Sequence, residues 1–439
     1  MNIQQLREAG VQYVRILWTD HANLIRAKAA HLSLLDAGLP DGVGIAAAQL
    51  ALPVMADVVV PGAGLGPVGE VRLVPDWDTL TVLPYAPAQA QVLGDLRLGA
   101  GPWDCCPRAF LREQIRAAAQ FGLTVNAAFE NEFFLLRRDN GSYTPADTTV
   151  FAHTSGFNRH ARFMLDLSAA LEAQGLQPEF YYPEAGPGQQ ELSVRYSDAL
   201  QAADQQITFR ETARGVAEAH GLVASFLPKP FEGVAGSGCH LNLSLWRDGA
   251  NAMADPHHPT GISREGQHFL AGVLFHLPAL CALSVPSHNS YHRLRPHFWA
   301  GAYTAWGYEN REAALRVSRA GHACSRFELK TSDASANPYL ALGALIAAGL
   351  DGIEQQRPLP AEAVGDPALM SEEARRASGI ELLPQSLHEA VTALERNTVL
   401  LDALGEARSR AYLAVRRAEW TALKDLNLPE ELQLLAERY

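Results

Sequence analysis

Two glutamates lie two residues apart in an apolar stretch, Asn126–Leu136, that reads NAAFENEFFLL. Alternate residues of a β-strand point to the same face, so Glu130 and Glu132 project together while Phe129 and Phe133 point the other way. Two neighbouring carboxylates repel each other, and in an apolar setting each raises the pKa of the other unless a cation lies between them. The pair therefore predicts a metal-binding strand.

Three later segments repeat this pattern of one apolar face and one face with ionisable or polar side chains. Their polar faces carry Glu191, Ser193 and Arg195; His240, Asn242 and Ser244; and Arg326, Glu328 and Lys330. Each segment alone could be an ordinary half-exposed strand. Four together favour a sheet curved around a polar, ligand-filled concavity.

The side chains best suited to bind a metal ion exceed what one ion needs. They are Glu130, Glu132, Glu184, Glu191, His240 and Glu328. One Mg²⁺ usually takes one or two carboxylates and keeps several waters or phosphate oxygens. This set therefore predicts two or more Mg²⁺ or Mn²⁺ ions.

Arginines gather in the later part of the chain, at Arg293, Arg295, Arg311, Arg316 and Arg326. The planar guanidinium group binds phosphate or carboxylate oxygens in pairs, although any one of these arginines could be a surface charge. A carboxylate-rich metal site beside them suggests phosphoryl transfer. A glycoside hydrolase would also need two carboxylates, but it has no use for six ligands and five arginines. The sequence contains neither a Gly-rich Lys-Ser/Thr motif nor a dinucleotide-binding Gly motif.

Composition limits the class of protein. The 439 residues are 48% hydrophobic and 19% charged, and the net charge of −12 comes without a basic run. A nucleic-acid partner is therefore not expected. The odd number of cysteines, 5, lacks zinc-like spacing and fits reduced thiols. Without a signal pattern or an apolar run of ~18 residues, we expect a soluble, cytoplasmic protein with no membrane association.

The elements that position these residues suggest two domains of an α+β protein. Residues 1–100 are mostly strand and begin with a hairpin, although the Gly-, Ala- and Pro-rich stretch 40–69 shows no clear pattern. The segment Arg97–Pro107, with three helix breakers, is the expected domain boundary. In the second domain, 107–439, strands are interspersed with helices. The helices are expected at 107–121, 158–174, 197–220, 264–283 and 337–351.

Several long motifs, in this order, resemble those of the glutamine synthetase family over nearly the whole chain. They are FENEF (129–133), PEAGPGQQEL (183–192), FLPKPFEGVAGSGCHLNLSLW (226–246), NSYHRLRP (289–296), WGYENREAALRV (306–317) and RFELKTSDASANPYLALGALIAAGLDGI (326–353). The resemblance implies a β-grasp-like N-terminal domain and a catalytic domain with a curved antiparallel sheet and a funnel-shaped site. It also implies a ring oligomer, a dodecamer, in which one subunit's N-terminal domain completes its neighbour's site.

The resemblance also implies a role for each matching residue. Glu132, Glu184 and Glu191 match ligands of the metal beside the substrate carboxylate, and Glu130, His240 and Glu328 match ligands of the metal that holds the nucleotide phosphates. Arg293 matches the arginine that grips glutamate, and Gly236 lies in the loop beside its amino group. Arg311 and Arg316 match phosphate contacts, and Ser244 and Arg326 lie in nucleotide-contacting segments. Arg293, Arg311 and Glu328 are thus the candidate catalytic residues. The family reaction phosphorylates the γ-carboxylate of glutamate with ATP, and an amine then displaces phosphate.

The sequence departs from synthetases proper where they bind ammonium. Trp299 stands in place of a flap glutamate that accepts a proton, Ala235 replaces an asparagine, and Lys330 replaces a substrate-binding arginine. Asp41 and Asp57 can be aligned with the aspartates of the ammonium loop, although the residues around them match poorly. This pattern resembles the branch that makes γ-glutamyl amides from larger amines. The alternatives are a glutamine synthetase that uses ammonia and a catalytically silent scaffold.

Overall fold

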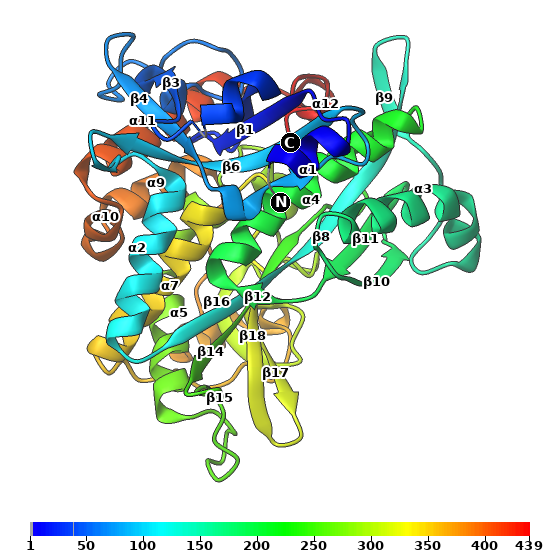
Figure 1. Ribbon diagram of the computed structural model, residues 1–439. Coiled ribbons are helices and arrows are strands. Elements are labelled where there is room, and N and C mark those ends of the chain that lie inside the picture. Colours follow the sequence, from blue (N-terminus) through cyan, green and yellow to red (C-terminus); the bar gives the residue numbers. More distant parts are fainter. Residues whose placement is uncertain (1–2, 38) are drawn as a thin grey trace.

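The computed structural model describes residues 3–37 and 39–439, which form two mixed β-sheets with helices packed against them (Figure 1). The smaller sheet has the order β2-β1-β6-β4-β3, with β5 and β7 paired to β6. Its strands are β1 (Tyr13–Thr19), β2 (Ile25–His31), β3 (Val43–Ala46), β4 (Glu70–Pro75), β5 (Thr81–Val82), β6 (Gln89–Leu98) and β7 (Gly101–Pro102). The expected hairpin is β1 with β2. The stretch that showed no clear pattern contains β3.

The larger sheet is built around β8 (Thr124–Asp139), a strand of 16 residues. Its order is β10-β11-β8-β14-β18-β17-β16, with β9, β12 and β13 paired to β8 and β15 paired to β14. These strands are β9 (Ser142–Pro145), β10 (Pro178–Pro183), β11 (Gln189–Val194), β12 (Ser197–Asp198), β13 (Val223–Ser225), β14 (Cys239–Arg247), β15 (Ala250–Asn251), β16 (Tyr303–Tyr308), β17 (Ala313–Ala320) and β18 (Ala323–Leu329). The sheet is mixed rather than purely antiparallel, because β16 and β17 run parallel.

The helices lie close to their expected positions. They are α1 (Ile3–Glu8), α2 (Pro107–Gln120), α3 (Thr154–Glu172), α4 (Ala199–Ala219), α5 (Arg264–Ser284), α6 (Ser290–Arg293), α7 (Pro338–Glu354), α8 (Glu372–Ala377), α9 (Leu387–Glu395), α10 (Thr398–Leu404), α11 (Glu406–Leu423) and α12 (Leu428–Leu435). Helix α3 begins four residues before its expected start at Asn158, because the His153 side chain caps it by accepting a hydrogen bond from the Ser155 backbone N–H. The α+β prediction is confirmed.

The apolar face of β8 packs against helices. The Phe133 ring lies 6.3 Å from that of Phe163 on α3, 6.2 Å from that of Phe209 on α4 and 5.5 Å from that of Phe226. The contacts with Phe163 and Phe209 are edge-to-face, and such contacts between buried rings fix the sheet against its helices. The apolar face therefore supports the polar face of the same strand.

Helix α5 is apolar and long enough to cross a membrane, contrary to the expectation that no such run exists. A stretch of 18 residues within this helix has a mean hydropathy of 1.4, but 78% of that stretch is buried inside the protein. Gly272 on α5 meets α7 so closely that an added Cβ would lie 2.3 Å from the Ala348 carbonyl oxygen. Helix α5 is therefore a core helix.

A buried arginine on α2 joins the smaller sheet to helix α4. Arg108 on α2 donates to Asp95 on β6 and to Asp76, both at 2.8 Å, and to Asp204 on α4 at 2.8–2.9 Å. Removing one partner of a buried ion pair usually lowers the stability of the folded protein by several kcal/mol.

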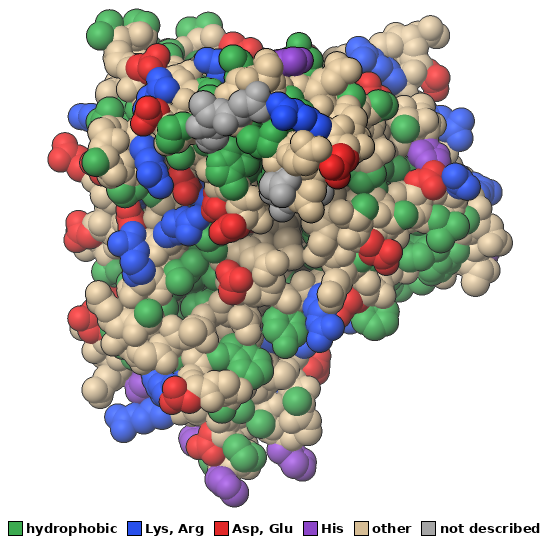
Figure 2. Space-filling model, viewed as in Figure 1, with side chains coloured by type: hydrophobic (Ala, Val, Ile, Leu, Met, Phe, Trp, Pro, Cys, Tyr) green, Lys and Arg blue, Asp and Glu red, His purple; other side chains and the backbone are tan. Residues whose placement is uncertain are grey.

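The domain boundary predicted from the sequence, between residues 100 and 107, stays a prediction. Basic and acidic side chains are interspersed over the face of the molecule shown in Figure 2.

Candidate active site

Strand register brings the polar faces of four strands together. In the antiparallel ladders Glu130 lies opposite His240, and Glu132 lies opposite Glu191. Glu328 on β18 lies opposite both Asn242 on β14 and Arg316 on β17. Because opposite residues in an antiparallel pair point to the same face, these side chains converge over adjacent strands.

The side chains predicted to hold the nucleotide metal form a compact group. One ligand atom from each of Glu130, His240 and Glu328 lies within 4.8 Å of the others. The His240 Nδ1 atom is 3.2 Å from Glu328 Oε1 and 3.9 Å from Glu130 Oε2. Glu132 Oε1 is also only 3.8 Å from the same imidazole nitrogen. The group can therefore supply oxygen and nitrogen ligands to one divalent ion.

The other three carboxylates influence one another strongly. Burial raises the pKa of Glu191 to about 10, with the charges of Glu130 and Glu132 adding to the effect. Burial and the charge of Glu184 raise the pKa of Glu132 to about 7, and burial also raises the pKa of Glu184. Carboxylates this close cannot all be ionised near neutral pH unless cations compensate them. Glu132, Glu184 and Glu191 therefore fit a hard, oxygen-liganded ion such as Mg²⁺ or Mn²⁺.

A buried glutamine that the sequence reasoning missed positions one of these ligands. The Gln189 side-chain amide donates to Glu132 Oε2 at 3.1 Å and to the Gly236 carbonyl at 3.0 Å. The Gly238 backbone N–H donates to the same Glu132 oxygen at 2.8 Å. Gln189 lies inside the PEAGPGQQEL motif. The sequence does not indicate that its side chain contacts Glu132, because the two residues are far apart in the chain.

Cationic side chains surround His240. Arg293 lies 3.2 Å and Lys330 3.5 Å from His240 Nε2, and Arg316 Nε lies 2.5 Å from Glu328 Oε2. Burial, followed by the charges of Lys330, Arg293 and Arg316, lowers the pKa of His240 well below its usual value. The imidazole is therefore neutral, which is the form that binds metal ions.

Gly236 allows the backbone to approach the guanidinium stem of Arg293. A Cβ at Gly236 would lie 2.4 Å from the Pro228 carbonyl oxygen and 3.1 Å from Arg293 Cγ. Arg293 itself is buried and donates to the Ser332 carbonyl at 3.3 Å. The loop and the arginine are thus brought together, as their predicted role with glutamate requires.

The residues predicted to contact the nucleotide lie along the same strands. Arg326 Nε donates to Asn242 Oδ1 at 2.9 Å, and the Asn242 amide lies 3.5 Å from Glu130 Oε2. Ser244, next on this face of β14, accepts a hydrogen bond from Trp246 at 2.9 Å. Arg311 is exposed, yet its charge contributes to the lowered pKa of His240. Asn242 links Arg326 to the metal group, a role that the sequence reasoning did not assign.

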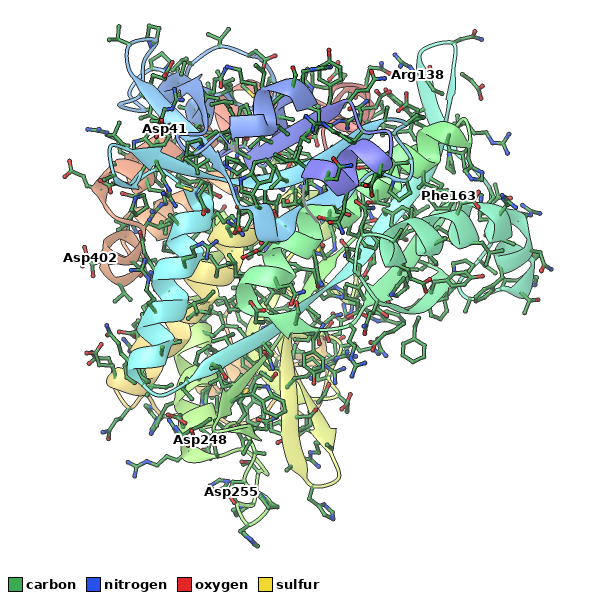
Figure 3. All side chains as sticks on the ribbon, viewed as in Figure 1. Asp41, Arg138, Phe163, Asp248, Asp255 and Asp402 are labelled. Atoms are coloured by element: carbon green, nitrogen blue, oxygen red, sulfur yellow. The ribbon has the colours of Figure 1, made fainter. Side chains whose placement is uncertain are left out.

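Two predicted substrate residues are exposed. Trp299 is 56% exposed, adopts φ 54°, and donates its backbone N–H to Glu312 Oε1 at 3.3 Å. Asp41 is exposed, and its carbonyl accepts from Arg72 at 2.7 Å. Figure 3 shows Asp41 beside β3 and β4 at the top left, away from β8, β11 and β14. Within one chain, Asp41 therefore lies apart from the metal group.

Comparison with known proteins identifies both parts of the chain. A family model described as the glutamine synthetase catalytic domain matches residues 104–435, and one described as the glutamine synthetase N-terminal domain matches residues 1–103. The γ-glutamylpolyamine synthetase GlnA3 of Streptomyces coelicolor is 40% identical over 96% of this chain and 92% of its own length. A glutamine synthetase of Clostridium saccharobutylicum is 34% identical over 95% of this chain and 94% of its own.

Solved structures have the same fold over the whole chain. A GmaS/ADP complex superposes with a TM-score of 0.86 at 30% identity, covering 98% of this chain and 97% of the other. A structure described as a novel glutamine synthase homolog also superposes with a TM-score of 0.86. It is 34% identical and covers 98% of this chain and 99% of its own. The likeness therefore includes both sheets and the segment that joins them.

Proposed function

Because this chain belongs to the glutamine synthetase family, as an ATP-dependent carbon–nitrogen ligase, we propose that it joins the γ-carboxylate of glutamate to an organic amine. The observation that carries the proposal is the contrast between a full set of six metal-binding side chains and a flap that bears Trp299 instead of a carboxylate. The likeness to a γ-glutamylpolyamine synthetase supports it.

Members of the family use ATP and divalent metal ions, and two groups of residues in this chain would each bind one ion. Glu130, His240 and Glu328 would hold one Mg²⁺ or Mn²⁺, and Glu132, Glu184 and Glu191 would hold another. Such ions neutralise charge on the phosphoryl group when bound. Two or more ions per site suit this number of ligands.

The basic side chains orient the two substrates. Arg293 binds the glutamate carboxylate beside Gly236 and Lys330, while Arg311, Arg316, Arg326 and Ser244 contact the nucleotide. A γ-carboxylate oxygen then attacks the terminal phosphorus of ATP, which releases ADP and leaves an acyl phosphate. The amine nitrogen attacks the acyl carbon, the C–O bond to phosphate breaks, and the nitrogen loses a proton. Substrates held in this way react as if at high local concentration.

Trp299 favours an organic acceptor over ammonia. Ammonium must lose a proton before it attacks, and loss of a positioned general base typically costs ~10²- to 10⁴-fold in rate. An alkylammonium group must also lose a proton, whereas an arylamine is already neutral near pH 7. An indole cannot accept a proton, but its face can pack on an alkyl or aryl group, which ammonia lacks, or lie over an ammonium group. The exposed position of Trp299 leaves this face available.

We further propose a ring of subunits, a dodecamer, in which Asp41 of one subunit completes the site of its neighbour. The position of Asp41 apart from the metal group of its own chain supports this arrangement. If it is correct, mixing Asp41→Ala and Glu130→Ala subunits restores activity, in about a quarter of the sites for random mixing in a ring. Each variant alone is expected to have low activity, and a mixture no more active than its components would exclude shared sites. We expect the assembly to be soluble and cytoplasmic.

One experiment tests the acceptor. Phosphate release is measured with ATP, Mg²⁺ and glutamate across ammonia, alkylamines, polyamines and arylamines, and mass spectrometry identifies each product. We expect a γ-glutamyl amide and a higher kcat/KM for at least one organic amine than for ammonia. Reactions without glutamate, and the Glu130→Ala variant, are the controls. If ammonia exceeds every amine, the protein is a glutamine synthetase. If no acceptor supports turnover, the scaffold alternative gains support.

A further inference from the structure

A second group of metal-binding side chains lies outside the proposed active site. His288 lies two residues before the start of α6, His292 lies within α6, and Glu431 lies on α12 near the C-terminus. The His288 Nδ1 and His292 Nε2 atoms are each 3.1 Å from the same oxygen, Glu431 Oε1. One ligand atom from each of the three residues lies within 4.8 Å of the others.

These distances suit a tetrahedral ion. With bonds of about 2.0–2.1 Å from zinc to nitrogen and oxygen, neighbouring ligand atoms lie about 3.3 Å apart. The two nitrogen-to-oxygen separations of 3.1 Å are close to that edge. Two imidazoles and one carboxylate are also a donor set that favours zinc over Mg²⁺, which prefers oxygen ligands.

The neighbouring residues hold the three side chains in place. Glu431 is fully buried, and its other oxygen, Oε2, accepts from the Asn289 amide at 2.6 Å. The His288 ring stacks on Trp420, with ring centroids 5.4 Å apart and planes 26° from parallel. Contacts of this kind orient metal ligands and raise the affinity of a site. The cluster therefore has a fixed carboxylate and at least one fixed imidazole.

The cluster is open to an ion from solvent. The side chains of His288 and His292 keep 11% and 29% of their surface exposed, while Glu431 forms the closed end. Water can thus occupy the fourth position of a three-ligand site.

We propose that His288, His292 and Glu431 bind a zinc-class divalent ion that ties the C-terminal helix α12 to the α6 segment. The cluster shares no residue with the proposed active site but adjoins it in the chain. His292 precedes Arg293 in the chain, and Asn289, which contacts Glu431, also accepts the Lys229 backbone N–H at 2.6 Å. Lys229 begins the loop that ends at Gly236. Binding therefore stabilises the segments that carry the proposed glutamate-binding residues.

The alternative arrangement has no metal, with both imidazoles donating hydrogen bonds to Glu431. The two arrangements differ in what they need from each residue. A hydrogen-bonded cluster tolerates Glu431→Gln and His292→Asn, because each keeps a polar group able to pair. A zinc site loses a strong ligand in either variant.

The test measures zinc bound by the full-length protein. Wild type and variants are incubated with Zn²⁺ in the presence of excess Mg²⁺ and then desalted. Elemental mass spectrometry gives the number of zinc ions per chain, and circular dichroism checks that each variant is folded. His288→Ala, His292→Asn and Glu431→Gln are compared with His388→Ala, whose exposed ring stacks on Trp420 outside the cluster.

We expect each of the three cluster variants to hold about one zinc ion fewer per chain than wild type, as removal of a ligand from a three-ligand site implies. His388→Ala should match wild type. Zn²⁺ should also raise the thermal midpoint of wild type and His388→Ala more than that of the cluster variants. Equal zinc content in folded cluster variants and in wild type would overturn the proposal.

Discussion

The metal-binding strands and the flap around Trp299 belong to the same proposed site but are built in different ways. On β8 and β14, ladder register sets Glu130 opposite His240, and the buried apolar faces fix both strands. Trp299 lies in the loop between α6 and β16, is 56% exposed, and adopts a left-handed backbone conformation that few non-glycine residues use. The proposed metal ligands, whose geometry must be precise, thus lie on the sheet, whereas the residue proposed to select the amine lies on a loop.

This difference suggests how the two regions tolerate change. A substitution on the strands alters ligand geometry shared by several charged groups, so its effect should be large and independent of the acceptor. A substitution in the flap should change the preference among acceptors while the phosphoryl-transfer step remains. The predictions below test that division.

The largest effect is expected from removing a metal ligand on the strands. Glu130→Ala or His240→Ala should lower glutamate-dependent phosphate release by roughly two orders of magnitude or more, the scale on which loss of an electrostatic transition-state contact acts. The loss should be similar for every amine. Steady-state kinetics with ammonia and one organic amine measure it.

The matched control is Glu179→Ala, which removes an exposed carboxylate from β10 in the same sheet. It should retain normal turnover. Near wild-type activity in both Glu130→Ala and His240→Ala would refute the metal assignment.

A smaller effect is expected where the loop meets the strands. In Gly236→Ala the new methyl group would clash with the Pro228 carbonyl oxygen and press on the Arg293 stem, at 2.4 and 3.1 Å. A displacement of about 1 Å in a positioning group can cost ~100-fold, so we expect about a 10- to 100-fold loss in kcat/KM for glutamate. The KM for ATP should change little. Gly66→Ala is the control for the added methyl group, because a Cβ there would meet nothing and Gly66 does not have a left-handed backbone.

The carboxylates predict an effect of pH on stability. The folded-state pKa of Glu132 is about 7 and that of Glu191 about 10, both raised from 4.5. Between about pH 5.5 and pH 8 the folded metal-free protein holds protons that the unfolded chain has released, so its stability falls as pH rises. Bound Mg²⁺ replaces those protons, and the increase in thermal midpoint caused by Mg²⁺ should grow by a few degrees over this range.

Thermal unfolding with Mg²⁺ and with a chelator, at several pH values, measures this effect. Glu191→Gln removes one raised carboxyl group and should flatten the pH dependence of the metal-free protein. A stabilisation by Mg²⁺ that is the same at both ends of the range would contradict the proposed ligand set.

The sequence predicts which side chains share a strand face, because the alternation of a strand depends only on neighbouring residues. Alternation placed Glu130 with Glu132 and His240 with Asn242 on shared faces, and family motifs then assigned roles to them. Which strand pairs with which could not be read in this way, because β8 contacts β11 and β14 from far along the chain. The contact of His292 with Glu431, 139 residues away, could not be predicted from the sequence for the same reason. Long-range pairing depends on the packing of the whole chain.

The smallest effect is expected at the flap, where Trp299→Glu should shift the preference toward ammonia. A cation–π contact contributes about 0.5–2 kcal/mol, so its loss should weaken use of a cationic organic amine by about 2- to 30-fold. The new carboxylate can accept a proton from ammonium, which should raise the rate with ammonia. The ratio of kcat/KM values for an organic amine and ammonia measures both changes. Val364→Glu adds the same charge at a position that is 88% exposed and should leave the ratio unaltered. If Trp299→Glu leaves the ratio at its wild-type value, Trp299 only packs the flap, and acceptor choice must lie elsewhere.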